Sequence, residues 1–138
     1  MEFGNDWDIS MCKIIAKEGH RFRDWIAWDD PDLCYDVDGY DHRIAVLPYD
    51  YNKNEYMTIS GFWWVAKKHV MQEEPLDEDL VQAAGEDVEW SMRVREKYNY
   101  VINTNSIVRL LRSKPISSYY VEGDEKYMNK GWEKQIND

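Results

Sequence analysis

The segment GEDVEWSMRVREKY, residues 85–98, carries the most regular helical pattern in the chain, and the elements around it are best interpreted from it. A glycine opens the segment, Glu86 and Asp87 follow at once, and basic residues gather toward its end. Because the N-terminus of a helix is the positive end of its dipole, each acid there stabilises the helix by about 0.3–1 kcal/mol. The pattern predicts a helix over residues 86–97, and helix stabilisation alone accounts for its charges.

The surroundings of this helix also favour a chemical role for the two acids. Gly85 allows another group to approach the backbone closely, and Trp90 adds a large planar ring one turn into the helix. The preceding segment ISGFWW, residues 59–64, contributes three more aromatic rings. An aromatic surface beside a carboxylate suits a sugar, and a carboxylate can accept the proton of a sugar hydroxyl as that hydroxyl attacks. Helix stabiliser and general base are therefore both open interpretations of these acids.

The rest of the chain alternates between strand-like and helix-like segments. Alternating apolar residues predict a strand over Ile9–Ile15 and a turn at residues 18–19. The acid-rich segment 28–43 is predicted to be a long loop, and residues 112–138 a polar C-terminal tail. The other predicted elements are strands over 43–49 and 56–64, a helix over 65–73, and two strands joined by a polar turn at 103–105 within 100–111. This order predicts an α/β fold, with a mixed β-sheet and flanking helices.

Composition excludes several classes of function. A chain of 138 residues makes one domain or part of one. Its net charge of −10 repels phosphate backbones and anionic membranes, so we expect no nucleic-acid partner. No apolar run approaches the roughly 20 residues of a membrane span, and the acidic start does not resemble a signal peptide. Cys12 and Cys34 have no metal-binding spacing, which is typical of a reduced, cytoplasmic protein.

One run of sequence resembles a known enzyme family. Residues 56–111, YMTISGFWWVAKKHVMQEEPLDEDLVQAAGEDVEWSMRVREKYNYVINTNSIVRLL, look like the acceptor-side, C-terminal half of a GT-A glycosyltransferase. The likeness rests on a strand that ends in Ser-Gly, a PLDE turn and a GED helix, in that order. The upstream pieces FGNDWDISMCKI and GHRFRDW resemble the segment that follows the nucleotide-binding half of these enzymes. The resemblance covers about residues 3–111.

The resemblance implies roles for individual residues. Asp87 matches the general base that activates the acceptor hydroxyl in inverting members, and Glu86 matches a neighbour that orients the acceptor. Further positions that match the donor- and acceptor-binding surface, or that flank the acids as described above, are Ser60, Gly61, Phe62, Trp63, Gly85 and Trp90. The partners implied are a nucleotide-sugar donor and a carbohydrate acceptor.

The same resemblance implies that part of the enzyme is missing. The nucleotide-binding half, with an Asp-x-Asp motif that binds Mn²⁺ or Mg²⁺, would precede residue 1. We therefore expect a divalent metal in the complete enzyme, no metal ligands in this chain, and no sugar transfer by this chain alone. An exposed sheet edge near residues 43–49, left by the missing half, is expected to promote self-association.

Two other interpretations compete with sugar transfer. The chain could be a non-catalytic carbohydrate-binding or protein-interaction domain derived from the fold, or a structural domain in which the two acids only cap a helix. The Trp25/Trp28 and Trp63/Trp64 pairs favour core positions over a sugar platform. Asp30 and Asp32 have Asp-x-Asp spacing, but no predicted strand precedes them, so a metal site there is disfavoured.

Overall fold

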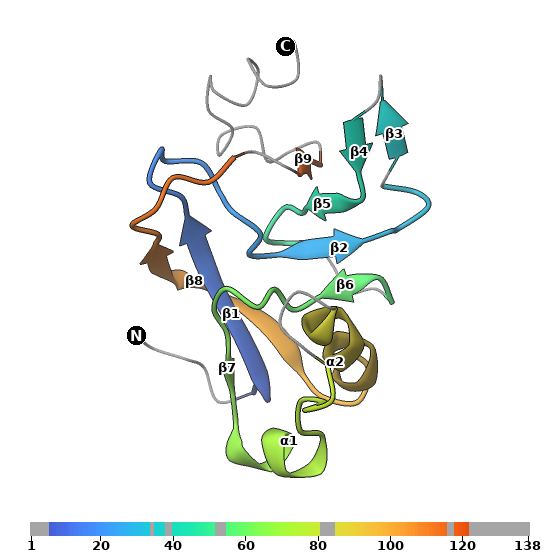
Figure 1. Ribbon diagram of the computed structural model, residues 1–138. Coiled ribbons are helices and arrows are strands. Elements are labelled where there is room, and N and C mark those ends of the chain that lie inside the picture. The colour runs from blue at the N-terminus through green and yellow to red at the C-terminus, as the bar shows by residue number, and fades with distance from the viewer. Residues whose placement is uncertain are drawn as a thin grey trace.

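The computed structural model describes residues 6–33, 35–37, 40–51, 55–80, 85–115 and 118–121. Its strands form one three-stranded sheet, one four-stranded sheet and one hairpin within these residues, and two helices lie at one end (Figure 1). The prediction of the α/β class, with mixed sheets and a few helices, is confirmed at that level. No described helix is both long enough and apolar enough to cross a membrane.

Strand β1 (Ile9–Ile15) has the bounds that the sequence predicted, and it is the centre of the three-stranded sheet. It pairs in parallel with β8 (Tyr100–Arg109) and antiparallel with β7 (Val65–Ala66). Six of its seven residues are buried, which fits a strand that is covered on both faces. Cys12 lies within it, and burial raises the pKa of its thiol to about 11. The expected turn follows, with Gly19 at φ 100° and its N–H bonded to Ala16 O.

Strand β8 differs from the prediction of two strands joined by a turn. It is one strand whose register against β1 shifts, because Cys12 pairs with Asn103 whereas Lys13 pairs with Ile107. The polar residues between these partners form an irregularity in the ladder rather than a reversal of the chain. Asn103 holds it, because its side-chain oxygen accepts the N–H of Asn105 and its amide contacts Ser106.

The four-stranded sheet has the order β6-β2-β5-β9 and uses short strands. Its strands are β6 (Met57–Thr58), β2 (Ile26–Trp28), β5 (Ile44–Val46) and β9 (Tyr119–Tyr120). The strands predicted over residues 43–49 and 56–64 are therefore much shorter than expected. The sheet-edge prediction near residues 43–49 is wrong for β5, because β5 lies between β2 and β9.

The two faces of this sheet have different partners. Ala27, Ala45 and Met57 join the main core, together with β1 and both helices. The alternate residues Ile26 and Ile44 point to the opposite face, in a small apolar cluster of their own with Trp28 packed against it. A cleft lies over this second face.

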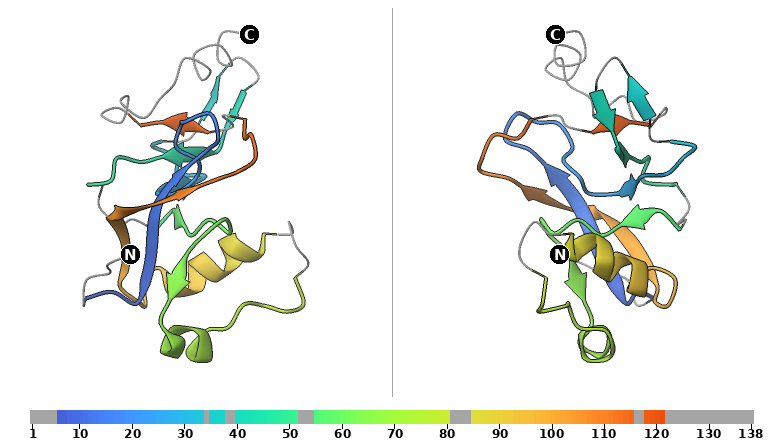
Figure 2. Two further views of the ribbon diagram at one scale, coloured as in Figure 1. Left: turned by 90° about the vertical axis from the view of Figure 1, so that its left-hand side faces the viewer. Right: turned by 45° about the vertical axis from the view of Figure 1, so that its right-hand side comes forward.

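The predicted loop over residues 28–43 contains strand structure that the sequence analysis missed. Strands β3 (Tyr35–Val37) and β4 (Tyr40–His42) pair as an antiparallel hairpin, and Asp36 stands opposite Asp41. Figures 1 and 2 show this hairpin at the end of the molecule farthest from the first helix. Cys34 and residues 38–39 lie outside the described residues, as do 82–84 and the tail beyond 121.

Both helices are shorter than predicted. Helix α1 (Lys68–Glu73) starts only after β7, because Val65 and Ala66 pair with β1 instead of continuing the helix. Helix α2 (Glu86–Val94) begins as expected but ends three residues before the predicted end. Its buried stripe is Trp90, Ser91 and Val94, whose spacing places them on one face.

A buried ion pair sits within the core beside β1. Arg21 Nη2 and Asp24 Oδ1 are 2.6 Å apart, and both side chains are fully inaccessible to solvent. Asp24 also accepts hydrogen bonds from the N–H groups of Ile14 and Trp25 and from the hydroxyl of Tyr49. A buried charge needs this many partners because the low-dielectric interior penalises any that is left unpaired.

Candidate functional site

A cleft of about 700 Å³ opens over the second face of the four-stranded sheet. Ile26, Trp28 and Ile44 line it from β2 and β5, and Thr58 lines it from β6. The loop at residues 60–62 and the start of α2 also line it. Clefts of this size that combine an apolar wall with a few polar groups are the usual form of a small-molecule site.

The structure brings most of the predicted site residues to this cleft. Ser60, Gly61 and Phe62 line it from one segment, and Gly85, Glu86 and Asp87 line it from another. The two segments are 26 residues apart at the contact between Gly61 and Asp87. These two predicted segments form two walls of one cleft.

Gly85 fixes the direction in which the helix enters the cleft. It is the N-cap of α2 with φ 88°, in the left-handed region that a side chain disfavours. A Cβ at this position would meet no atom within 4 Å, so the requirement for glycine comes from the backbone angle and not from crowding.

Asp87 joins the two walls through Oδ2, while Oδ1 forms a hydrogen bond within its own segment. Oδ1 accepts the N–H of Val88 at 2.9 Å, and Oδ2 accepts the N–H of Gly61 at 3.4 Å. The second contact is long for a hydrogen bond of this type, so Oδ2 is the more weakly held oxygen. A Cβ on Gly61 would stand 3.7 Å from Oδ2, which is an ordinary contact.

Ser91 reinforces the same junction from inside the protein. Its hydroxyl donates to Asp87 O at 2.6 Å and accepts the N–H of Ile59 at 2.7 Å. Ser91 and Ile59 are both fully buried. The hydroxyl therefore ties the first turns of α2 to the residue that immediately precedes the 60–62 loop.

Arg23 is a cleft residue that the sequence analysis did not identify. Its φ of 46° is unusual for a residue with a side chain, and such strain gathers at functional sites. Burial lowers the pKa of its guanidinium, and the nearby carboxylate of Asp87 acts in the opposite direction. The cleft therefore contains one cation beside two acids, and nothing in the local sequence RFRDW distinguished Arg23 from its neighbours.

Glu86 has an oxygen that the described residues leave without a hydrogen bond. Its Oε2 is inaccessible to solvent and has no partner among them. A buried carboxylate oxygen in that state costs free energy unless a ligand or a water donates to it.

The predicted aromatic residues divide between the cleft and the core. Phe62 is 43% exposed, lines the cleft and makes an edge-to-face contact with Phe22 at 4.8 Å. Trp90 is 1% exposed and packs against Trp64, so the expectation that it faces a ligand is corrected. Trp63 packs against the core and does not line the cleft. Trp28 was expected in the core but lines the cleft.

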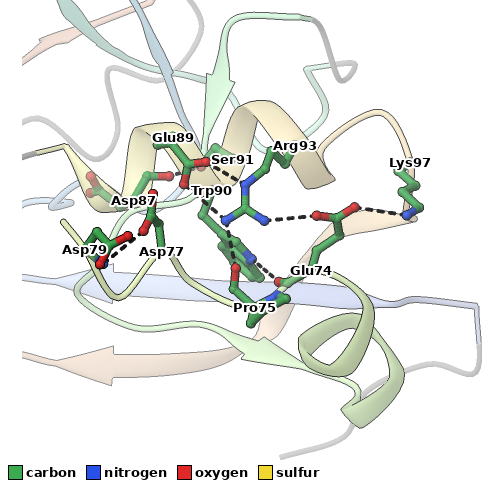
Figure 3. A network of polar contacts seen from close by, with 10 residues as sticks. All are labelled: Glu74, Pro75, Asp77, Asp79, Asp87, Glu89, Trp90, Ser91, Arg93 and Lys97. Atoms are coloured by element: carbon green, nitrogen blue, oxygen red, sulfur yellow. Dashed lines mark hydrogen bonds and ion pairs between the residues drawn. The ribbon is translucent and has the colours of Figure 1, made fainter.

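A polar network fixes α2 against the end of α1 (Figure 3). Glu74 accepts hydrogen bonds from Arg93 at 2.9 Å and from Lys97 at 3.0 Å, and its carbonyl accepts the indole N–H of Trp90. Glu89 pairs with Arg93 at 2.6 Å, an interaction between helix positions four apart. These contacts hold the helix body, so the position of the two acids at its start is set by the fold.

The cleft does not suit the divalent metal that the family resemblance implies. Among the residues that the structure describes, no three His, Cys, Asp or Glu side chains gather to form a metal site. The two carboxylates of the cleft share it with Arg23, whose charge opposes a cation. Asp30, of the Asp-x-Asp spacing, instead accepts the N–H of Asp32 in a local turn.

Comparisons with protein-family models, with curated proteins and with solved structures gave no match to this chain.

Proposed function

We propose that the cleft binds a carbohydrate acceptor, and that this chain is the acceptor-side half of a GT-A-like glycosyltransferase with Asp87 as the general base. One observation carries the proposal: two segments distant in sequence, 60–62 and 85–87, meet at one cleft and bring two carboxylates beside an aromatic wall. Sugars combine hydroxyl groups with apolar ring faces, and such a cleft offers partners for both. Phe62 and Trp28 provide the apolar surface.

The proposed reaction uses Asp87 Oδ2, the oxygen held only by the long contact to Gly61. The acceptor hydroxyl gives its proton to this oxygen while the hydroxyl oxygen bonds to the anomeric carbon of a nucleotide-sugar. The bond from that carbon to the diphosphate breaks, and its electron pair leaves with the nucleoside diphosphate. Glu86, which lines the cleft, would orient the acceptor by accepting a hydrogen bond from a second hydroxyl. General-base catalysis of this kind typically contributes 10²–10⁴-fold in rate.

The donor is assigned to a nucleotide-binding half outside this chain, together with the Mn²⁺ or Mg²⁺ that the family implies. That metal would polarise the diphosphate when bound. The residues of this cleft do not form a site for it, so the contribution of this chain to the reaction comes from Asp87 and Glu86. This chain alone is therefore expected to bind an acceptor without turning it over.

A non-catalytic carbohydrate-binding domain is the second candidate function. It is favoured by the backbone contacts of Asp87, whose two oxygens both accept N–H groups. A carboxylate in that position can serve mainly to hold the cleft together. In that case ligand binding would need the shape of the cleft but no proton acceptor.

The first experiment is a titration of the ¹⁵N-labelled chain with neutral hexoses, amino sugars and disaccharides. At about 10 mM ligand, a Kd of 1 mM would give nearly full occupancy. We expect amide shifts at residues 60–62 and 85–88 for at least one class of sugar. If no sugar perturbs these amides, both carbohydrate proposals fail.

The second experiment separates the catalytic from the binding role. Asp87→Asn keeps the shape of the side chain but cannot take up a proton. Asp79→Asn, an exposed acid that does not line the cleft, is the matched control. In a protein that joins this chain to a donor half, Asp87→Asn should lose transfer and retain acceptor binding, while Asp79→Asn loses neither. Undiminished transfer by Asp87→Asn would leave only the binding role.

A further inference from the structure

A second surface, separate from the cleft, lies along the last part of β8 and the residues that follow it. Residues 98–121 contain three basic residues and no acid, although the whole chain has 27 Asp and Glu. Within this segment Ile107 is 53% exposed and Leu111 is 91% exposed. Arg109 and Arg112 are exposed beside them. We name residues 107–112 the basic edge.

The backbone of the basic edge is available for pairing. In the sheet order β7-β1-β8, strand β8 has β1 on one side and no other described strand on its outer side. The N–H of Leu110 bonds to Ile15 O. Because hydrogen-bonding groups alternate along a strand, the N–H groups of Ile107 and Arg109 point away from β1.

The side chains alternate in the same way. Val108 and Leu110 pack against the main core and fix the strand, while Ile107 and Arg109 face solvent. An added strand would therefore find both unpaired backbone groups and apolar contact on one rigid edge. Main-chain bonds provide affinity in this mode of recognition, and alternate side chains provide specificity.

Charge decides which occupant fits. Two copies paired along this edge would bring Arg109 and Arg112 of both chains to one seam, and each chain carries a net charge of −10. Both features oppose a dimer through this edge. An acidic strand from another protein removes the first objection, because its carboxylates would face Arg109 and Arg112. The exposed Ile107 and Leu111 require apolar residues between its acids.

We propose that the basic edge binds an extended segment of a partner protein, in which acidic and apolar residues alternate, as an added strand beside β8. The alternative is that the arginines and the register shift of β8 only protect an edge from aggregation, as charges and irregularities do on many edge strands. A purely protective edge would bind no strand at all. The proposal is independent of the cleft and its function.

The test uses a fluorescein-labelled ten-residue peptide of alternating Val and Glu, with a Val and Lys peptide as the reversed-charge control. Fluorescence anisotropy should show saturable binding of the first peptide only, and binding should weaken as salt rises from about 50 to about 500 mM because screening increases. The double variant Arg109→Glu/Arg112→Glu should bind about tenfold more weakly, from two exposed charge pairs. Lys68→Glu, an exposed change on α1, should bind as the unchanged chain does.

A backbone variant distinguishes strand addition from simple charge attraction. Ile107→Pro removes an outward N–H without removing a bond to β1, so it should abolish peptide binding while thermal unfolding shows the chain still folded. Three results would each overturn the proposal: both peptides bind equally, neither peptide shows saturable binding, or Ile107→Pro binds the peptide as well as the unchanged chain does. A concentration-dependent dimer that Ile107→Pro dissolves would assign the edge to a second copy, and would also overturn it.

Discussion

Ser91→Ala should destabilise the chain more than the same substitution at an ordinary buried serine, because the hydroxyl of Ser91 forms hydrogen bonds with two segments. The hydroxyl accepts the N–H of Ile59 and donates to Asp87 O, and both bonds are short. Alanine would leave the N–H of Ile59 without an acceptor in a fully buried position. Orphaning a buried donor costs about 1–3 kcal/mol, several times the loss of an exposed hydrogen bond.

That cost should be visible as a shift in thermal unfolding. For a chain of this size, 1 kcal/mol corresponds to about 4 °C in Tm, so Ser91→Ala should unfold about 4–12 °C lower. The change is a large share of the roughly 5–15 kcal/mol that holds such a domain together. The fold should nevertheless survive, because the core contacts of Trp90 and Val94 on either side are unchanged.

The assays are thermal unfolding, which gives Tm, and urea unfolding, which gives the free energy. Both are followed by circular dichroism and by tryptophan fluorescence, and agreement of the two probes is the check for two-state behaviour. Ser10→Ala is the matched control: Ser10 is equally buried, but its hydroxyl donates to Met11 O and accepts no N–H from the part of the chain that the structure describes. Ser10→Ala should lower the free energy of unfolding by less than Ser91→Ala does. If the two variants lose the same free energy, or if Ser91→Ala loses less than about 0.5 kcal/mol, the proposed junction between α2 and residue 59 contributes little.

Three further predictions concern the core, the helix start and pH. Asp24→Asn leaves the buried charge of Arg21 unpaired and should cost about 3–5 kcal/mol in urea unfolding; a loss below 1 kcal/mol would refute this. Gly85→Ala should lower the free energy of unfolding by about 1–2 kcal/mol, because alanine disfavours the left-handed backbone angle of Gly85. Gly61→Ala should change thermal unfolding little, because a Cβ there would make only ordinary contacts. A larger loss from Gly61→Ala than from Gly85→Ala would contradict this reasoning. Burial lowers the pKa of His20, so the unfolded chain binds the proton more readily. Stability should therefore fall as pH drops below 6.5, more than in His20→Gln, and parallel pH profiles of the two proteins would oppose this.

The elements that the sequence predicted well are those with a strong local signal. Strand β1 follows from its apolar alternation, and the start of α2 follows from a glycine and two acids. Both signals act within a few residues, so no knowledge of tertiary neighbours was needed. The end of α2 was missed because the basic residues after Val94 extend the helical pattern without extending the helix.

The errors arose where pairing with distant strands decides the structure. Val65 and Ala66 have helical character but pair with β1, and Asn103 holds an irregularity of β8 that resembles a turn in sequence. The β3–β4 hairpin did have a local signal. An Asp-Gly pair at residues 38–39 between apolar and aromatic residues is a strong hairpin pattern, and the acid-rich composition obscured it.

The cleft was predictable only where its residues also shape the local backbone. Gly85 and the acids after it stand out because a helix start needs them, and that need is visible in sequence. Arg23 and Trp28 reach the cleft from β2 and the residues before it, so only the tertiary fold assigns them there. Trp90 was misplaced because a helix pattern does not say which face is buried when both faces carry large residues.

The two interpretations of the acids at the start of α2 are compatible in this geometry. The bond from Val88 N–H to Oδ1 of Asp87 is the helix-stabilising contact, and it uses one oxygen only. The other oxygen has only the long 3.4 Å contact with the N–H of Gly61, which leaves it able to accept a proton from a ligand. A group that must take part in catalysis has to be held in one orientation by contacts of this kind. The structural role of Asp87 is therefore a precondition for the proposed chemical one, and a stability change in Asp87→Asn would not by itself decide between them; only ligand binding and transfer can.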